Sequence, residues 1–308
     1  MAVPAAESVR SRPIAARTGE LRALVESFRP GQWSRNGFVL AALVFARQLA
    51  VPRQVGLALT AAADFCLLSS AVYLVNDVFD LNEDRNNPVK RYRPIASGRL
   101  PARTAMMAAL LLTLLAFAVA WRLGPAFFLC SALYLGLNLA YSGFLKQVML
   151  LDVFVIAAGF VLRVVAGGVV IHVAISSWLI VCTTLLALFL ALSKRRHELV
   201  VLETGAASQR RSLARYSAYF LDQLIVIVTA STVMSYVLYT LSDDVRMKFP
   251  GKRLELTVPF VLFGIFRYLF LVHRDQKGDD PARLLFTDPV LLNVVLLWGI
   301  AVVLLIYL

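Results

Sequence analysis

The chain has 308 residues, of which 59% are apolar and only 16% are charged, and its mean hydropathy is +0.74. A soluble domain is roughly 45–50% apolar and about 25% charged, so these proportions exclude an ordinary soluble fold and indicate membrane spans. The net charge of +12 could suggest a nucleic-acid partner, but the Lys and Arg residues stand in short clusters between apolar blocks, as they do in cytoplasmic loops. We therefore expect a membrane protein that binds no nucleic acid.

The N-terminal segment is rich in Arg and has no apolar core of the signal-peptide kind, so residues 1–32 are expected to form a cytoplasmic tail. The rest of the chain, residues 33–308, is expected to form one transmembrane domain. Its three cysteines, Cys66, Cys130 and Cys182, lie within apolar runs and lack CxxC spacing. This pattern predicts small buried side chains rather than a disulfide framework or a zinc site.

Nine apolar segments approach the length of about 20 residues that a transmembrane helix needs. Their apolar runs are continuous rather than alternating, which predicts helices and not the strands of a barrel. The first segment is short, so its helix should begin near Trp33. The segments are Phe38–Ala50, Gln54–Asp77, Arg103–Trp121, Ala126–Tyr141, Met149–His172, Ile175–Ser193, Ala218–Leu241, Leu256–His273 and Pro289–Leu308. We predict an all-α, polytopic membrane protein with nine transmembrane helices around a central polar cavity open to the cytoplasmic side.

The distribution of positive charge predicts the orientation. If the N-terminus lies inside, the tail and the loops after every second segment hold 22 Lys and Arg residues, whereas the opposite loops hold 7. Loops that remain in the cytoplasm carry such an excess. The N-terminus and the polar cavity are therefore expected to face the cytoplasm, in a multi-pass protein of the cell (inner) membrane.

An acidic stripe closes the second segment. On a continuous helix its members share one face, because they follow one another at spacings of three and four residues: Asp77, Asp80, Asp84 and Asn87. Carboxylate and amide oxygens suit Mg²⁺, which also binds substrate phosphates. We predict a Mg²⁺ site, with Mn²⁺ as an alternative ion, in which the three carboxylates act in catalysis; its ligands would be Asn76, Asp77, Asp80 and Asp84. The simpler alternative is a solvated helix end, although acids there oppose the helix dipole.

A basic run follows the stripe. Cations beside a metal–carboxylate cluster suit a polyanion such as a diphosphate, so Lys90 and Arg93 are expected to bind substrate. The alternative is an ordinary positive-inside signal. Gln32 and Arg35 precede the first segment and could join the same cavity.

Polar residues also lie near the fourth and fifth segments. Tyr141 and Lys146 follow the fourth segment and are expected to bind substrate, whereas Asp152 opens the fifth and is expected to act in catalysis. Arg163 comes eleven residues later, about three helical turns, and so shares the face of Asp152. An unpaired charge at mid-span costs about 2.5–3.5 kcal/mol or more. We therefore expect Arg163 to bind a substrate phosphate, the alternative being an ion pair with a buried acid.

The end of the sixth segment carries Lys194 and Arg195, which could receive an anionic lipid head group. The alternative is a topology signal that binds nothing. Within the fifth segment, Gly167 and Gly168 would allow another segment to pack closely.

The chain resembles the UbiA-type intramembrane prenyltransferase superfamily over roughly residues 24–308. The motifs that carry the resemblance are Arg29-Pro30-x-Gln32-Trp33, Asn76-Asp77-x-x-Asp80-x-x-x-Asp84 and Arg93-Pro94-Ile95-Ala96-x-Gly98. The resemblance implies a transferase built as a bundle of nine helices around a central cavity, capped by cytoplasmic loops.

The second half of the chain departs from the aromatic prenyltransferases of that superfamily, which carry a second aspartate motif after the fourth span. It is similar instead to the decaprenyl-phosphate phosphoribosyltransferase branch, through Tyr141-Ser142-x-x-Leu145-Lys146 with the single Asp152, Ser193-Lys194-Arg195-x-x-Glu198, and Gly278-Asp279-Asp280-Pro281 with Thr287-Asp288.

The branch implies Mg²⁺-dependent transfer of 5-phosphoribose from PRPP to a polyprenyl phosphate, such as a decaprenyl phosphate. The products would be polyprenyl-phosphoryl-5-phosphoribose, for cell-envelope arabinose or ribose glycans, and diphosphate. The expected partners are PRPP, the polyprenyl phosphate lipid and the membrane, and a homo-oligomer is compatible with the sequence. Two alternatives stay open. One is an aromatic polyprenyltransferase with a polyprenyl diphosphate donor, and the other is a transporter, for which inverted repeats would be expected.

Overall fold

The computed structural model describes residues 14–88, 90–203, 215–274 and 281–308. Within these residues all regular elements are helices, which confirms the predicted all-α fold. In chain order, with η marking a 3₁₀-helix, they are α1 (Ile14–Ser27), η1 (Pro30–Leu40), α2 (Ala41–Phe45), α3 (Pro52–Phe79), α4 (Leu81–Asn86), η2 (Lys90–Tyr92), α5 (Ala102–Leu123), α6 (Pro125–Gly143), η3 (Leu145–Gln147), α7 (Leu151–Val170), α8 (Ser177–Glu203), α9 (Ala218–Leu241), α10 (Asp243–Lys248), η5 (Leu254–Thr257), α11 (Val258–Arg274), α12 (Pro281–Thr287) and α13 (Pro289–Tyr307).

Eight helices in the described part of the chain are long and apolar enough to cross a membrane, and each coincides with a predicted segment. Local sequence explains where several of them begin. Proline occupies the first turn of α3, α6 and α13, where its missing N–H costs no helical hydrogen bond. Ser217 and Asp288 cap α9 and α13 by accepting backbone N–H groups. Among these eight helices, the end that differs most from its predicted bound is that of α8, which continues past Ser193 and so carries Lys194 and Arg195.

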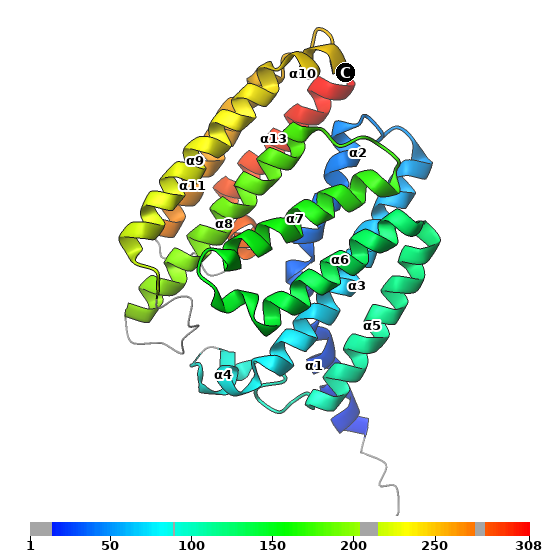
Figure 1. Ribbon diagram of the computed structural model, residues 1–308, viewed down its shortest axis with the longest axis vertical. Coiled ribbons are helices and arrows are strands. Elements are labelled where there is room, and N and C mark those ends of the chain that lie inside the picture. Colours follow the sequence, from blue (N-terminus) through cyan, green and yellow to red (C-terminus); the bar gives the residue numbers. More distant parts are fainter. Residues whose placement is uncertain (1–13, 89, 204–214, 275–280) are drawn as a thin grey trace, which may run out of the picture.

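The first predicted segment is not a long α-helix. It consists of η1 and the five-residue α2, so the count of nine spanning helices is not confirmed. A 3₁₀-helix rises about 2.0 Å per residue against 1.5 Å for an α-helix, so these sixteen residues extend about 30 Å, close to the bilayer core. Figure 1 shows this stretch passing from α1 at one end of the molecule to α2 near the other.

The predicted glycine contact explains how η1 enters the bundle. At Gly167 of α7, a Cβ atom would stand 1.9 Å from the backbone oxygen of Val39, far inside van der Waals contact. Gly168 is similarly close to the side chain of Ile175. Close packing of a helix is therefore confirmed at Gly167, where the partner is the 3₁₀-helix η1, whereas the neighbour of Gly168 belongs to the connection between α7 and α8.

The segments that carry the predicted site residues share one end of the bundle. Figure 1 shows α1, α4, the connections that follow α3 and α6, and the C-terminal end of α8 at one end, and α2, α10 and the C-terminus at the other. Of the basic segments that the charge count placed on one side, those that the structure describes thus lie at one end. That this end, with its expected cavity, faces the cytoplasm stays a prediction.

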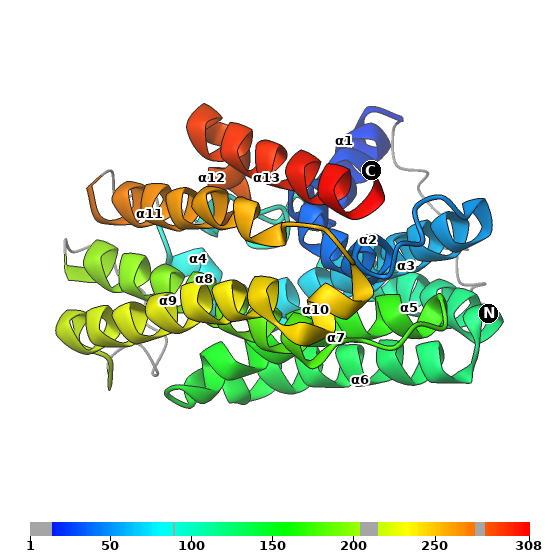
Figure 2. The same cartoon turned by 90° about the horizontal axis from the view of Figure 1, so that it is seen from above.

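The most buried of the eight long helices are α3 and α7. In the most apolar stretch of each helix, 50% of the residues of α3 and 56% of those of α7 are buried, against 17–39% in the other six. Figure 2 shows α6 along one side of the bundle and α11 and α13 along the opposite side. Of the two most buried helices, α3 carries Asp77 and α7 carries Asp152 and Arg163, so packing fixes these charged residues inside the bundle.

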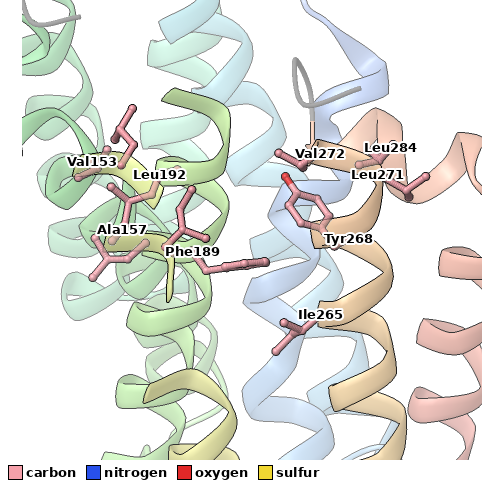
Figure 3. Packing of buried hydrophobic residues seen from close by; sticks show 14 of the residues in the cluster. Val153, Ala157, Phe189, Leu192, Ile265, Tyr268, Leu271, Val272 and Leu284 are labelled. Carbon is pink, nitrogen blue, oxygen red and sulfur yellow. The ribbon is translucent and has the colours of Figure 1, made fainter. Parts of the chain in front are cut away.

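An apolar cluster fixes α8 against its neighbours. Phe189 of α8 meets Tyr268 of α11 with ring centroids 5.2 Å apart, and Val153 of α7 belongs to the same cluster as Leu192 of α8 (Figure 3). Because Leu192 lies one turn before Arg195, this apolar contact sets how the charged end of α8 approaches α7.

Candidate active site

The acidic stripe does not continue along one helix, and this part of the prediction is wrong. The helix α3 ends at Phe79, Asp80 has φ −88° and ψ 7°, and α4 starts at Leu81. An acidic helix end is disfavoured by the negative C-terminal dipole. The break at Asp80 lets its carboxylate turn toward a partner of its own, while Asp77 and Asp84 still meet around one cation.

Two arginines hold the first pair of carboxylates. Arg29, just before η1, donates from Nη2 to Asp77 Oδ1 over 2.5 Å, and its guanidinium lies 5.0 Å from the ring centre of Tyr73. Arg93 donates from Nη1 to both Asp77 Oδ1 (3.1 Å) and Asp84 Oδ2 (2.7 Å). Asp77 and Asp84 are both buried. The Nη1 atom of Arg93 therefore lies within hydrogen-bond distance of the carboxylates of both Asp77 and Asp84.

The third carboxylate is held from the α6–α7 connection. Lys146, in η3, donates from Nζ to Asp80 Oδ1, and Asn76 donates from Nδ2 to Asp80 Oδ2 over 3.0 Å. Both ends of the Lys146–Asp80 pair are largely buried. The structure thus brings the predicted Lys146 to the acidic motif. We call this group the acidic cluster: Arg29, Asn76, Asp77, Asp80, Asp84, Arg93 and Lys146.

The formal charges of the acidic cluster balance, three carboxylates against three cations. Burial raises the pKa of the Asp84 carboxyl above its usual value, and the nearby Arg93 and Lys90 oppose that rise. The two cations therefore favour the ionised form of this buried carboxylate. A ligand that takes one cation away must supply positive charge in return.

The donor set of the acidic cluster fits a magnesium ion in part. No group of three or more His, Cys, Asp or Glu side chains surrounds a common point among the described residues, so the predicted set of four ligands is not assembled. Asp77 and Asp84 do approach one cationic nitrogen. Mg²⁺ commonly takes one or two carboxylates and completes its shell with water and substrate phosphate, which these two residues could support.

The remaining predicted residues of the first half are Lys90, which interacts with Asp84, and Gln32 and Arg35, which follow Arg29 in the chain. Lys90, in η2, is half-buried, and its backbone N–H donates to Asn87 Oδ1 over 3.0 Å. Gln32 and Arg35 are half-buried on η1, and the Gln32 N–H donates to the Arg29 carbonyl over 2.8 Å. Their roles toward substrate stay predictions.

A second ion network joins α6, α7 and α8. Arg195 donates from Nε to Asp152 Oδ2 (2.7 Å) and from Nη2 to the Tyr141 hydroxyl (2.9 Å), and its Nη1 donates to Glu198. The Tyr216 hydroxyl donates to Asp152 Oδ1 over 2.9 Å. We call these five residues the Arg195 network. Three predicted residues, Tyr141, Asp152 and Arg195, are thus in direct contact, and Lys194 lies 3.9 Å from Glu198 at the rim.

Arg163 is buried in α7 and meets neutral partners. Its Nε donates to Asn36 Oδ1 (2.8 Å), its Nη1 to the Gly159 carbonyl (2.9 Å) and its Nη2 to the Tyr134 hydroxyl (2.7 Å). The Tyr134 ring centre lies 4.6 Å from the guanidinium carbon. The alternative of a buried acid as partner is not observed among the described residues. Arg163 instead ties α7 to η1 and α6.

Sequence reasoning missed three of these residues. Arg29 was visible only as part of a motif, and nothing in its neighbourhood indicated that it would meet Asp77. Tyr134 and Tyr216 are single tyrosines in apolar or loop sequence, without a signal of their own. Of the late motif, residues 278–280 lie outside the described residues, and Asp288 pairs with Arg267 over 2.7 Å while it caps α13.

Comparisons with known proteins agree with this architecture. Residues 37–288 match the family model of the UbiA prenyltransferase family. The decaprenyl-phosphate phosphoribosyltransferase of Mycobacterium tuberculosis is 32% identical over 283 residues, which cover 89% of this chain and 91% of that protein. The enzyme of the same name from Corynebacterium glutamicum is 33% identical over 290 residues, which cover 92% and 86%.

Solved structures share the fold at low sequence identity. A UbiA homologue from Archaeoglobus fulgidus bound to DMAPP and Mg²⁺ superposes with a TM-score of 0.66 at 16% identity, covering 91% of this chain and 99% of that one. A digeranylgeranylglyceryl phosphate synthase superposes with a TM-score of 0.63 at 15% identity, covering 93% and 99%. The family model matches most of the chain, and eight of the described helices are apolar enough to cross a membrane. This chain is therefore a multi-pass membrane protein that belongs to the UbiA prenyltransferase family.

Proposed function

We propose that this protein transfers 5-phosphoribose from PRPP to a polyprenyl phosphate, in an Mg²⁺-dependent reaction at the end of the bundle that carries the acidic cluster. The observation that carries the proposal is the likeness of about a third of all residues, over nine-tenths of the chain, to enzymes named for this transfer. This end of the bundle would face the cytoplasm, where the 22 basic residues of the tail and loops are expected.

The charges of the acidic cluster support a substrate with several anionic groups. Mg²⁺, when bound, would neutralise charge on the diphosphate leaving group. Asp77 and Asp84 would hold the ion, with Asn76 and Asp80 next to it. Arg29, Arg93 and Lys146 are already at this place, and each could exchange a carboxylate oxygen for a phosphate oxygen of the donor.

The proposed transfer does not require a strong general base. The C1–O bond between ribose and diphosphate breaks, and an oxygen of the lipid phosphate forms a new bond to C1 from the opposite face. That phosphate is already ionised at neutral pH. The protein therefore acts by positioning the two anions and by stabilising the leaving group. Lys90 and Arg35 would bind phosphate oxygens, and Gln32 would bind a ribose hydroxyl.

The Arg195 network lies on the side of α8 and would serve the acceptor. The Lys194 side chain, at the rim of the network, is 33% exposed, and it would meet the lipid phosphate. Asp152 and Arg195 are buried, so their part would be to hold Tyr141 and the end of α8 in place. Arg163 would meet the 5-phosphate from inside the bundle, through an N–H group that its bonds to Asn36, Gly159 and Tyr134 do not use.

A direct assay tests the proposal. Purified protein in lipid nanodiscs would receive radiolabelled PRPP, a polyprenyl phosphate and Mg²⁺, and label should move into the lipid phase. A parallel reaction would offer a polyprenyl diphosphate and an aromatic acceptor. Transfer in the second reaction alone would replace the proposal by an aromatic prenyltransferase. Loss of transfer with EDTA and recovery with Mg²⁺ would test the dependence on metal.

A further inference from the structure

We propose that Tyr216 is a positioning residue, whose hydroxyl holds the α6–α7 connection in the shape that presents Lys146 to the acidic cluster and Asp152 to Arg195. This inference rests on the proposed function, because it concerns the same site. The residue lies in the segment before α9, far from the acidic motif in sequence.

The Tyr216 hydroxyl makes two hydrogen bonds to one short stretch of chain. It accepts the backbone N–H of Leu150 over 2.7 Å and donates to Asp152 Oδ1 over 2.9 Å. Burial raises the pKa of the Tyr216 phenol to about 12, so the hydroxyl keeps the proton that it donates. One side chain from another part of the chain thus bridges the residue before α7 and its first turn.

The backbone at Leu150 gives that bridge a purpose. Leu150 has φ 66° and ψ −43°, a region near the strained γ-turn that residues with a Cβ rarely adopt. Its carbonyl accepts the N–H groups of Val153 and Phe154, so the strained residue also starts α7. Without the Tyr216 hydroxyl, the Leu150 N–H would lose its partner and the strain would have less to oppose its release.

The α6–α7 connection joins the two ion clusters. Tyr141, at the end of α6, and Asp152, at the start of α7, both contact Arg195, whereas Lys146 between them contacts Asp80. A change of shape at Leu150 would move the connection at a point four residues after Lys146. The hydroxyl of Tyr216 would in this way act on the donor site through a neighbouring segment.

A packing role is the alternative, because Tyr216 belongs to the apolar cluster around α8 and its ring stacks on Phe220 at 6.4 Å between centroids. Phenylalanine keeps that packing and removes only the hydroxyl. Tyr219, three residues later and 74% exposed, offers a matched control. Glycine at position 150 would remove the strain, since glycine adopts positive φ readily, and the Leu150 side chain is partly exposed.

The experiment compares wild type, Tyr216→Phe, Tyr219→Phe, Leu150→Gly and the Tyr216→Phe/Leu150→Gly double variant, all as full-length protein. Amide hydrogen exchange over residues 144–152 reads the connection itself, and KM for PRPP and kcat read the site. Tyr216→Phe should exchange faster there and raise KM for PRPP about 3- to 10-fold, the size of one hydrogen bond, with a smaller change in kcat. Tyr219→Phe should match wild type, and Leu150→Gly should restore KM in the double variant to within about twofold.

Each other outcome decides a different question. Unchanged exchange in Tyr216→Phe would overturn the inference, whatever the kinetics. Faster exchange without a change in KM would overturn the link to the donor site. A double variant no better than Tyr216→Phe would show that Leu150 is not the residue through which the hydroxyl acts. If wild type does not use PRPP, the proposed function fails, while the exchange arm still tests whether Tyr216 holds the connection.

Discussion

The acidic cluster and the Arg195 network lie at the same end of the bundle and use the same kinds of side chain, but their arginines differ in exposure. In the acidic cluster the side chains of Arg29 and Arg93 are 21% and 27% exposed. In the Arg195 network the Arg195 and Asp152 side chains are 2% and 0% exposed. A cation that reaches solvent can change partners when a substrate arrives, whereas a buried one cannot leave without exposing a bare charge to a low dielectric.

The difference separates two functions that residue types alone do not separate. Partly exposed arginines opposite buried carboxylates form a site that can exchange ligands. A fully buried Arg–Asp pair with two tyrosine hydroxyls forms a joint between helices. Variants in the acidic cluster should therefore lose activity first, and variants of the buried Arg195–Asp152 pair should lose stability first.

The largest effect is expected when a carboxylate of the acidic cluster is removed. Asp77→Ala and Asp80→Ala should each lower the rate of phosphoribosyl transfer about 100-fold or more, because the leaving group would lose its ion and the cations their partner. Both should still purify as folded protein. Rates would be measured with saturating Mg²⁺. Asp244→Ala, on exposed α10 at the other end, is the control. Rates near wild type in Asp77→Ala would remove this stripe from the active site.

A large loss of stability is expected at the buried pair. Arg195→Met would leave the Asp152 carboxylate buried without its cation, at a cost of about 3–5 kcal/mol in unfolding free energy. Arg93→Met, at a more exposed cation, should cost clearly less. Unfolding of both in the same detergent would be followed by thermal or denaturant titration. Equal losses in the two variants would contradict the distinction between the clusters.

The predictable part of this structure is what a local pattern determines. The length of the apolar runs predicts the eight long helices. The distribution of Lys and Arg predicts which of the described charged segments lie at one end of the bundle. Two members of the predicted stripe, Asp77 and Asp84, both contact Arg93. Such features depend on residues close in sequence, or on the bilayer, which acts on every segment alike.

The unpredicted part depends on contacts between distant segments. The close contact between the Val39 backbone of η1 and Gly167 of α7 joins two segments that are far apart in sequence, so it could not be predicted from local sequence. One partner of Asp80 comes from η3 and one partner of Asp152 from the segment before α9, and no spacing in sequence indicates Lys146 or Tyr216 as those partners. The break of the acidic helix at Asp80 likewise reflects a cation supplied from another segment.

Arg163 belongs neither to the acidic cluster nor to the Arg195 network. It is buried like Arg195, but its hydrogen-bond partners are neutral. Arg163→Gln should cost about 1.5–3 kcal/mol through lost hydrogen bonds, less than Arg195→Met, since no carboxylate is left bare. If the guanidinium also binds a substrate phosphate, KM for PRPP should rise, and Arg163→Lys should restore it only in part. Thermal stability and PRPP kinetics would be measured on both variants. A stable, kinetically normal Arg163→Gln would place this residue outside the active site.

The smallest effect is expected at an ion pair that lies wholly at the surface. Arg99 donates from Nη1 and Nη2 to both oxygens of Glu26, over 2.9 and 3.1 Å, and so links α1 to the segment before α5. Both side chains are 48% exposed, and water and salt therefore screen the attraction. Glu26→Gln should change the unfolding free energy by less than about 1 kcal/mol, and the change should shrink further as salt is raised. Unfolding at low and high ionic strength, beside Arg195→Met as the buried reference, would measure both quantities. If Glu26→Gln destabilised the protein as much as Arg195→Met, exposure would not be the property that separates the ion pairs of this protein, and the two clusters would need another explanation.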